Sequence, residues 1–151
     1  MDTKDTKYMK LAIKEAQKAL QNDEVPIGCV IVQDDKIIAR AYNNRNKSRL
    51  ATAHAEITAI NKACRKVGDW RLNNCTIYIT LEPCPMCAGA IFNARIGRVV
   101  FGASEPAGGA FGGAIDLSSC NLVNHKLVVT SGIMRDECAS LLSNFFSKKR
   151  S

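Results

Sequence analysis

Two cysteines, Cys84 and Cys87, are separated by two residues in the segment LEPCPMCAGAI at residues 81–91. A C-x-x-C pair beside a strand and a helix start can be a redox dithiol, because the positive end of the helix stabilises a thiolate. The same spacing can supply half of a zinc site. This segment alone leaves both chemistries open, so the choice depends on residues elsewhere in the chain.

The segment TAHAEITAI at residues 52–60 supplies the missing groups, His54 and Glu56. A redox dithiol requires neither of them. A zinc ion bound by two thiolates needs further ligands, and an imidazole is a favoured one. Three protein ligands leave one tetrahedral position for water, which is typical of catalytic zinc sites. We therefore expect one zinc ion held by His54, Cys84 and Cys87.

Glu56 is then predicted to be the catalytic base. Two thiolates neutralise the charge of a zinc ion, so such an ion acidifies its water less than one held by three neutral histidines. A nearby carboxylate that does not bind the metal can accept the proton. In the first turn of a helix, His54 and Glu56 could both reach a site beyond the helix end, one as a ligand and the other as a proton carrier.

Composition narrows the class of protein. The chain has 151 residues and a net charge of +7, and its polar N-terminus shows no signal peptide. Without an apolar run long enough to span a bilayer, we expect a cytoplasmic protein with no membrane contact. The positive charge favours a polyanionic partner, although it could serve solubility alone. Seven cysteines in such a chain argue against a disulfide framework. The remaining five are expected to be small buried side chains: Cys29, Cys64, Cys75, Cys120 and Cys138.

Hydrophobic periodicity predicts the elements that position these groups. Helices are expected over residues 8–20, over 52–66 with Thr52 as the N-cap, from Pro83 to 94, and over 134–150. Strands are expected over 27–43, as a hairpin turning at Asp34 and Asp35, and over 75–81, 98–103 and 126–132. Residues 105–114 read as a mobile glycine-rich rim without a phosphate-binding motif, and His125 as a structural group that hydrogen-bonds within its loop.

This order of elements predicts an α/β fold, a mixed sheet with helices on both faces, in a single domain over residues 1–151. The cysteine pair and His54 would both lie at helix starts, where free N–H groups and positive dipole ends are found.

The pattern H-x-E followed by P-C-x-x-C is the signature of zinc nucleobase deaminases. Further segments, among them EVPIGCVIV, ARAYNNR, IYITLEPCPMCAGAI and DECASLLSNFF, resemble the bacterial tRNA-specific adenosine deaminases from about residue 8 to 150. The resemblance implies a three-layer α/β/α cytidine-deaminase-like fold with a five-stranded mixed sheet, usually in a homodimer. It also implies zinc-dependent conversion of the wobble adenosine of a tRNA anticodon to inosine.

The resemblance assigns further residues to the substrate. Asn43 matches a position that hydrogen-bonds the base, and Pro26 and Ile27 fall where the base pocket is lined. Glu105 keeps an acidic position after FGA, but Pro106 to Gly108 replace a lysine and a threonine found in many relatives. The tail matches a segment that meets the anticodon stem-loop, through Phe145, Lys149 and Arg150.

The basic groups Arg45, Lys47, Arg49 and Lys148 also suit RNA phosphates, and a phenylalanine beside KKR suits base stacking. Phe146 is predicted to lie in the core, whereas the periodicity leaves Phe145 open between core and RNA. Two alternatives remain: a deaminase of a free base or nucleoside such as guanine or cytosine, and a thiol redox or structural-zinc protein.

Overall fold

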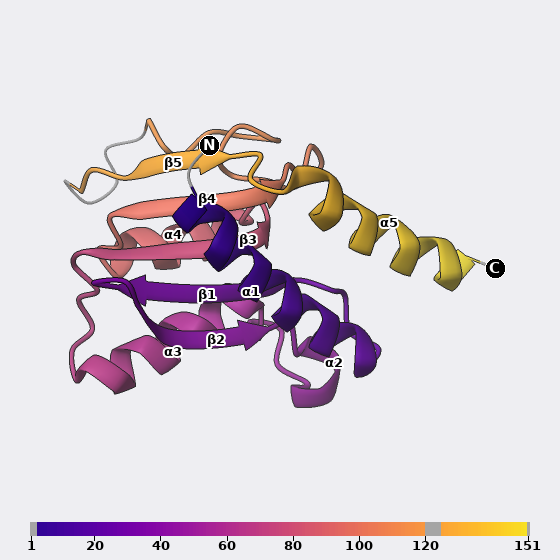
Figure 1. Ribbon diagram of the computed structural model, residues 1–151, viewed down its shortest axis with the longest axis horizontal. Helices are drawn as coiled ribbons and strands as arrows, with labels where there is room; N and C mark the ends of the chain where they lie inside the picture. The colour runs from indigo at the N-terminus through magenta and orange to yellow at the C-terminus, as the bar shows by residue number, and fades with distance from the viewer. Residues whose placement is uncertain (1–2, 120–124, 151) are drawn as a thin grey trace.

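A five-stranded mixed sheet forms the centre of the protein (Figure 1). The computed structural model describes residues 3–119 and 125–150, with side chains for 4–119 and 125–149. The strands lie in the order β2-β1-β3-β4-β5; β1 is antiparallel to both of its neighbours, and β3, β4 and β5 are parallel. Their bounds are β1 Gly28–Gln33, β2 Lys36–Tyr42, β3 Cys75–Leu81, β4 Arg98–Ala103 and β5 Val128–Ser131.

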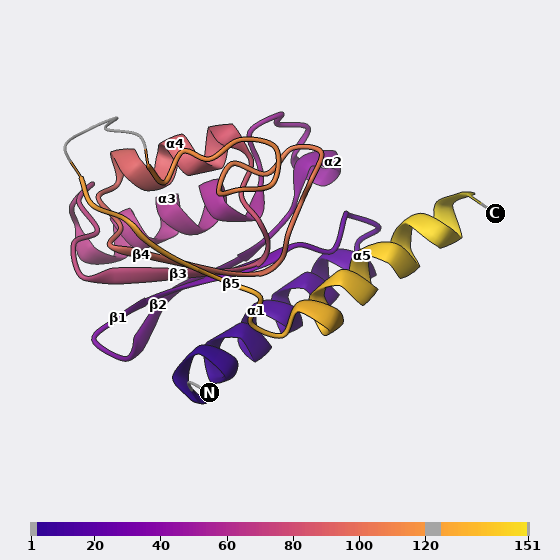
Figure 2. The same ribbon diagram turned by 90° about the horizontal axis from the view of Figure 1, so that it is seen from above.

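Helices cover both faces of this sheet, as Figure 2 shows from above. The α1 and α5 helices lie on one face and α3 and α4 on the other, which confirms the predicted α/β/α layers. Their bounds are α1 Thr3–Gln21, α2 Arg45–Ser48, α3 Ala55–Val67, α4 Pro85–Asn93 and α5 Arg135–Arg150. The short α2 helix was not expected, because four residues with no buried side chain give no periodic signal.

Close packing of α1 on β1 depends on a glycine. Tyr8, Met9, Ala12 and Ala16 recur at helical spacing and are buried against the sheet. A Cβ atom at Gly28 would lie 2.0 Å from the carbonyl oxygen of Ala12 and 2.4 Å from the backbone nitrogen of Ala16. Only glycine therefore allows the helix to approach the first strand this closely.

The hairpin and the helix starts refine the expected boundaries. Asp34 and Asp35 both have positive φ, as a two-residue turn between twisted strands requires. Thr52 is not the N-cap of α3, because the helix begins at Ala55 and His54 takes the extended N-cap conformation. Pro83 is not in the first turn of α4 either: Cys84 is its N-cap, and Pro85 fills the first helical position.

Other expectations concern isolated cysteines and His125. Cys29, Cys75 and Cys138 are buried as predicted and Cys64 is half-buried, whereas Cys120 lies outside the described residues.

The His125 Nε2 atom lies 2.6 Å from the carbonyl oxygen of Ile96. Among the described residues, this contact joins His125 to the segment before β4. No helix among residues 3–119 and 125–150 is long and apolar enough to cross a membrane.

An ion pair between buried Asp5 and partly exposed Arg98 ties α1 to the middle of the sheet. The Asp5 carboxylate accepts hydrogen bonds from the Arg98 guanidinium at 2.6 and 2.8 Å and from the Tyr78 hydroxyl at 2.8 Å. The hydrogen bonds from Arg98 are the largest of the effects that lower the pKa of Asp5 below its ordinary value. A carboxylate with a depressed pKa stabilises the fold above its unfolded pKa, and this contribution disappears as the pH falls through the folded value.

We predict that Asp5→Asn lowers the free energy of unfolding by about 2 kcal/mol at pH 7, because charge-assisted hydrogen bonds are lost. Urea denaturation should show the difference between variant and wild type shrinking below about pH 4. The control is Asp35→Asn, since Asp35 forms a solvent-exposed pair with Lys4 and should matter little. An equal gap at pH 7 and pH 3 would contradict the assigned role of Asp5.

Candidate active site

The ends of two helices bring the predicted metal ligands together. His54 and Cys84 are the N-caps of α3 and α4, both with extended backbone and with side chains that make no capping hydrogen bond. Cys87 follows in the first turn of α4. Because neither N-cap side chain serves its own helix, both are available to the space between the two helix starts.

The three ligand atoms are spaced as around one metal ion. The Nδ1 atom of His54 lies 3.7 Å from the Cys84 sulfur and 3.5 Å from the Cys87 sulfur. All three atoms lie within 4.8 Å of one another. A tetrahedral ion with bonds of about 2.3 Å to sulfur and about 2.0 Å to nitrogen separates S and N ligands by about 3.6 Å. The three side chains therefore fit one metal ion without rearrangement.

The pKa values of the two cysteines are shifted in opposite directions. The hydrogen bond from the Cys87 thiol lowers the pKa of Cys84 to about 5, and the same hydrogen bond raises the pKa of Cys87. A coordinated cysteine is a thiolate, so binding of a metal would displace this remaining proton. Because its pKa is lowered, Cys84 forms a thiolate at a lower pH than an ordinary cysteine.

Glu56 lies in the first turn of α3 beside the ligand cluster. It is 4% exposed, and burial is the main cause that raises its pKa to about 7. A carboxyl group with a pKa near the operating pH can both accept and return a proton. Its position matches the predicted proton carrier, which does not have to ligate a metal.

A pocket of about 330 Å³ opens over this cluster. Its wall includes His54, Glu56 and Cys84, together with Ile27 from the segment before β1 and Glu105 from the loop after β4. Two of the residues expected at the substrate, Ile27 and Glu105, are thus placed at the candidate active site. Pro26 is buried next to Ile27 and is not among the residues that line this pocket.

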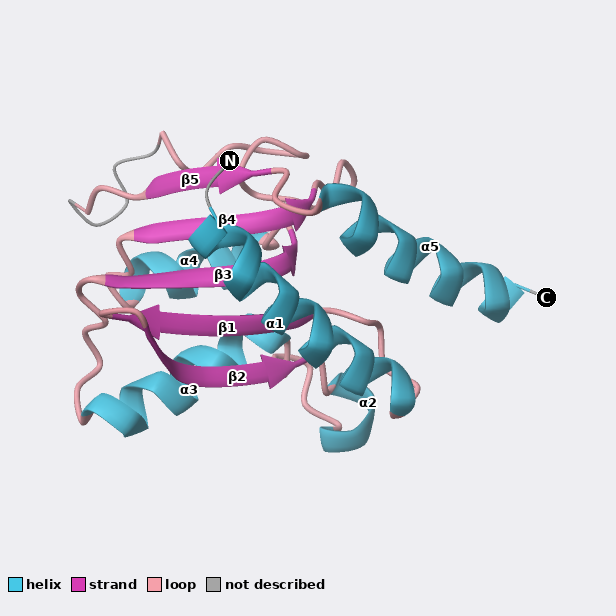
Figure 3. Ribbon diagram, viewed as in Figure 1, coloured by secondary structure: helices cyan, strands magenta, loops and turns pink. Residues whose placement is uncertain are grey.

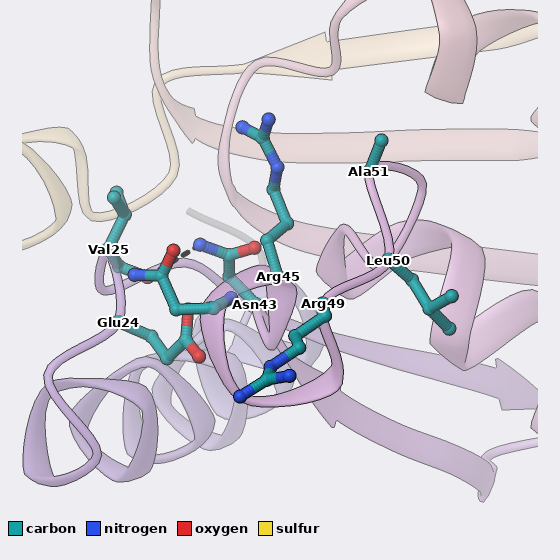
Figure 4. A pocket seen from close by; sticks show the side chains of 8 residues that line it. Glu24, Val25, Asn43, Arg45, Arg49, Leu50 and Ala51 are labelled. Carbon is teal, nitrogen blue, oxygen red and sulfur yellow. Dashed lines mark hydrogen bonds between the residues drawn. The ribbon is translucent and has the colours of Figure 1, made fainter.

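Asn43 lines a second pocket of about 440 Å³, shown in Figure 4, whose wall includes Arg45 and Arg49. The Asn43 amide donates to the carbonyl oxygen of Val25 at 3.4 Å, while its own side-chain oxygen is buried and has no partner among the residues that the structure describes. An unpaired buried oxygen is costly unless a ligand or water pairs with it. Asn43 thus lies in the wall of the neighbouring pocket, and its contact with the base stays a prediction.

The two phenylalanines of the C-terminal helix differ in burial. Phe145 is 8% exposed, whereas Phe146 is 41% exposed, so the prediction that Phe146 lies in the core is wrong. Lys149 lies over the Phe145 ring and forms an ion pair of 2.8 Å with Asp23. The side chain of Arg150 lies outside the described residues. The RNA contacts predicted for Phe145, Lys149 and Arg150 stay predictions.

Sequence reasoning missed Glu82, a buried carboxylate between β3 and the cysteine pair. It accepts hydrogen bonds from three backbone amides of the loop of residues 104–113. These bonds tie the loop down, which argues against the mobile rim expected from its glycines. The sequence signals available were Glu82, the acidic residue before P-C-x-x-C, and Gly109 and Gly113, which follow it by 27 and 31 residues. No spacing rule relates an acidic residue to glycines so far along the chain.

Known proteins resemble this chain along nearly its whole length. The MafB19-like deaminase family matches residues 3–150. A tRNA-specific adenosine deaminase of Bacillus subtilis is 49% identical, over 98% of this chain and 92% of its own. A solved structure from work on A-to-I editing by tRNA:A34 deaminases at the wobble position of transfer RNA is 44% identical, with a TM-score of 0.87 over 91% of this chain and 99% of its own.

Guanine deaminase of Bacillus subtilis is also similar in structure. It is 31% identical, with a TM-score of 0.63 over 100% of this chain and 96% of its own. Its identity and structural similarity are both lower than those of the tRNA deaminase structure. The chain therefore belongs to the MafB19-like deaminases, and among them to the family of bacterial tRNA-specific adenosine deaminases.

Proposed function

We propose that this chain hydrolytically deaminates adenosine to inosine at the wobble position of a tRNA anticodon, with one zinc ion held by His54, Cys84 and Cys87. One observation carries the chemistry: a buried carboxylate, Glu56, beside three ligand atoms spaced for one tetrahedral ion. The substrate is supported by relatives that are named tRNA-specific adenosine deaminases.

The chain's residues would divide the reaction between them. A zinc ion in the site would supply an acidified water molecule as the nucleophile. The Glu56 carboxylate would accept a proton from the attacking water and deliver it to N1 of the adenine ring. It would then take a second proton from the hydroxyl group newly added at C6 and pass it to the departing amine. Its buried surroundings exclude bulk water, so the proton stays with the reacting groups. Ile27 and the loop after β4 enclose the base.

The RNA itself would meet groups outside the catalytic pocket. Arg45 and Arg49 line the neighbouring pocket and suit phosphate oxygens. Figure 1 shows that the C-terminal part of α5 extends beyond the sheet. Phe146 on this helix is exposed and would be available for stacking on a base. An anticodon loop is single-stranded, so less energy is needed to extrude its target base.

On the family resemblance we also propose that the 151 residues act as one deaminase domain, in a cytoplasmic homodimer. Light scattering of the purified chain tests the oligomeric state. A monomer at micromolar concentration would remove that part of the proposal.

We predict that the purified protein converts adenosine at position 34 of a transcribed tRNA to inosine, while carrying about one zinc ion per chain. Nucleoside analysis of the digested tRNA reads the product, and metal content is measured on the same sample. Free guanine, cytosine and adenosine serve as comparison substrates. If the protein deaminated a free base rapidly and left the tRNA unmodified, it would instead be a free-base deaminase.

We predict that Glu56→Ala and Glu56→Gln keep the zinc and lose activity by about 10² to 10⁴, because the proton carrier is gone. Zinc content and the single-turnover rate are measured together. Glu137→Gln, at an exposed position on α5, is the control and should behave as wild type. Loss of zinc from both Glu56 variants would show that Glu56 is instead a ligand.

We predict that Phe146→Ala raises the Kd for an anticodon stem-loop about five- to tenfold, because an exposed stacking surface is removed. Its melting temperature should stay that of the wild type. Phe145→Ala, the matched variant, should lower the melting temperature because that ring is buried. Unchanged affinity in Phe146→Ala would remove this ring from the RNA surface.

A further inference from the structure

We propose that Glu82 is a positioning residue for deamination: its carboxylate holds the loop of residues 104–113 in place as one wall of the catalytic pocket. This inference rests on the proposed function for its kinetic consequence. Its structural part, that Glu82 holds the loop, stands on the contacts of this chain alone.

The Glu82 carboxylate is satisfied entirely by this loop. It is 3% exposed, and its Oε1 atom accepts from the Glu105 amide at 2.9 Å. Its Oε2 atom accepts from the Phe111 and Gly113 amides, each at 2.8 Å. Within the part of the chain that the structure describes, no lysine or arginine pairs with this carboxylate. Because a buried charge needs such partners, the loop and Glu82 stabilise each other.

Two glycines allow the loop to close around the carboxylate. A Cβ atom at Gly109 would lie 2.2 Å from the carboxyl carbon of Glu82 and 2.4 Å from both oxygens. A Cβ atom at Gly113 would lie 2.6 Å from Oε1 of the same carboxylate. The glycine-rich sequence therefore serves an anion, as such loops commonly do, but the anion belongs to the protein.

The loop is also joined to the strand end that leads to Cys84. The Glu82 amide donates to the carbonyl oxygen of Ala103 at 2.8 Å, and the Ala110 amide donates to that of Pro83 at 2.9 Å. Figure 3 shows that the loop after β4 leaves the sheet at the same end at which β3 ends. Metal ligand and pocket wall are thus fixed to each other through residues 82 and 83.

The pocket wall formed by this loop includes Glu105, Ala107 and Gly108. Glu82 itself also lines this pocket, but both of its carboxylate oxygens already accept from loop amides. We therefore assign it an effect on the base through the loop that it holds. A base held about 1 Å away from its productive position can cost a factor of about 10² in rate. The distance between this wall and Glu56 is therefore the quantity that Glu82 controls.

The first test is Glu82→Gln, which keeps the shape but turns an NH₂ group toward loop amides that need an acceptor. We expect kcat/KM for an anticodon stem-loop to fall on the order of tenfold to a hundredfold. Zinc content should stay at about one per chain. In hydrogen–deuterium exchange, the amides of Glu105, Phe111 and Gly113 should exchange faster, while those of β1 and β3 should keep their wild-type rates.

The second test reaches the same contact from the loop side. Gly109→Ala should reproduce both the kinetic loss and the local exchange. Gly97→Ala is the control, because its Cβ atom would meet only the carbonyl oxygen of Cys75 at an ordinary 3.8 Å, away from the pocket. This pair decides the question even where Glu82→Gln does not fold.

Wild-type kcat/KM or unchanged exchange at the three loop amides, in both variants or in Gly109→Ala alone where Glu82→Gln does not fold, would overturn the proposal. Zinc loss, or faster exchange throughout the sheet in both variants, would also overturn it by assigning Glu82 to general stability. A wild-type protein that fails to deaminate RNA would instead refute the proposed function. The exchange comparison would still decide whether Glu82 holds the loop.

Discussion

The convergence of two helix starts at one end of the sheet is the constraint on which the rest of the site depends. His54 and Cys84 can meet only because α3 and α4 both begin beside the carboxyl end of β3 and pack on the same face. The antiparallel pairing of β1 with β3 brings Ile27, just before β1, to this same end. A shift of one residue in that pairing would turn the side chains of β1 to the opposite face.

Two buried carboxylates near this end have opposite surroundings. Glu82 accepts three backbone hydrogen bonds, which fix its carboxylate in place. For Glu56, burial outweighs the hydrogen bonds from its own amide and from Cys87, and its pKa is raised to about 7. The first arrangement suits a structural anion and the second suits a proton carrier. Equal burial therefore does not imply an equal role, because the donors around each group decide it.

The sequence predicted those features that depend on local spacing. The helices, the strands and the ligand set of His54, Cys84 and Cys87 follow from periodicity and from the motif, and the fold confirms the layers. Features that depend on tertiary contacts were missed, because Glu82 meets amides 23 to 31 residues away. Phe146 was wrongly predicted to be in the core, and Phe145 was left open. Phe145 lies seven residues, two helical turns, after buried Cys138 and so shares its buried face, whereas Phe146 does not.

The internal anion limits what the glycine-rich loop can do for an RNA substrate. Three of its backbone amides already point at Glu82, and two of its glycines are needed to admit that carboxylate. Such a loop has fewer free N–H groups with which to hold a phosphate, and Ala107 and Gly108 add no cationic side chain. The phosphates of the proposed substrate would then have to be neutralised from other elements. Arg45 of α2 and Arg49, the C-cap of that helix, line a pocket that would suit this. Recognition of the base and recognition of the backbone are thereby divided between separate segments of the chain.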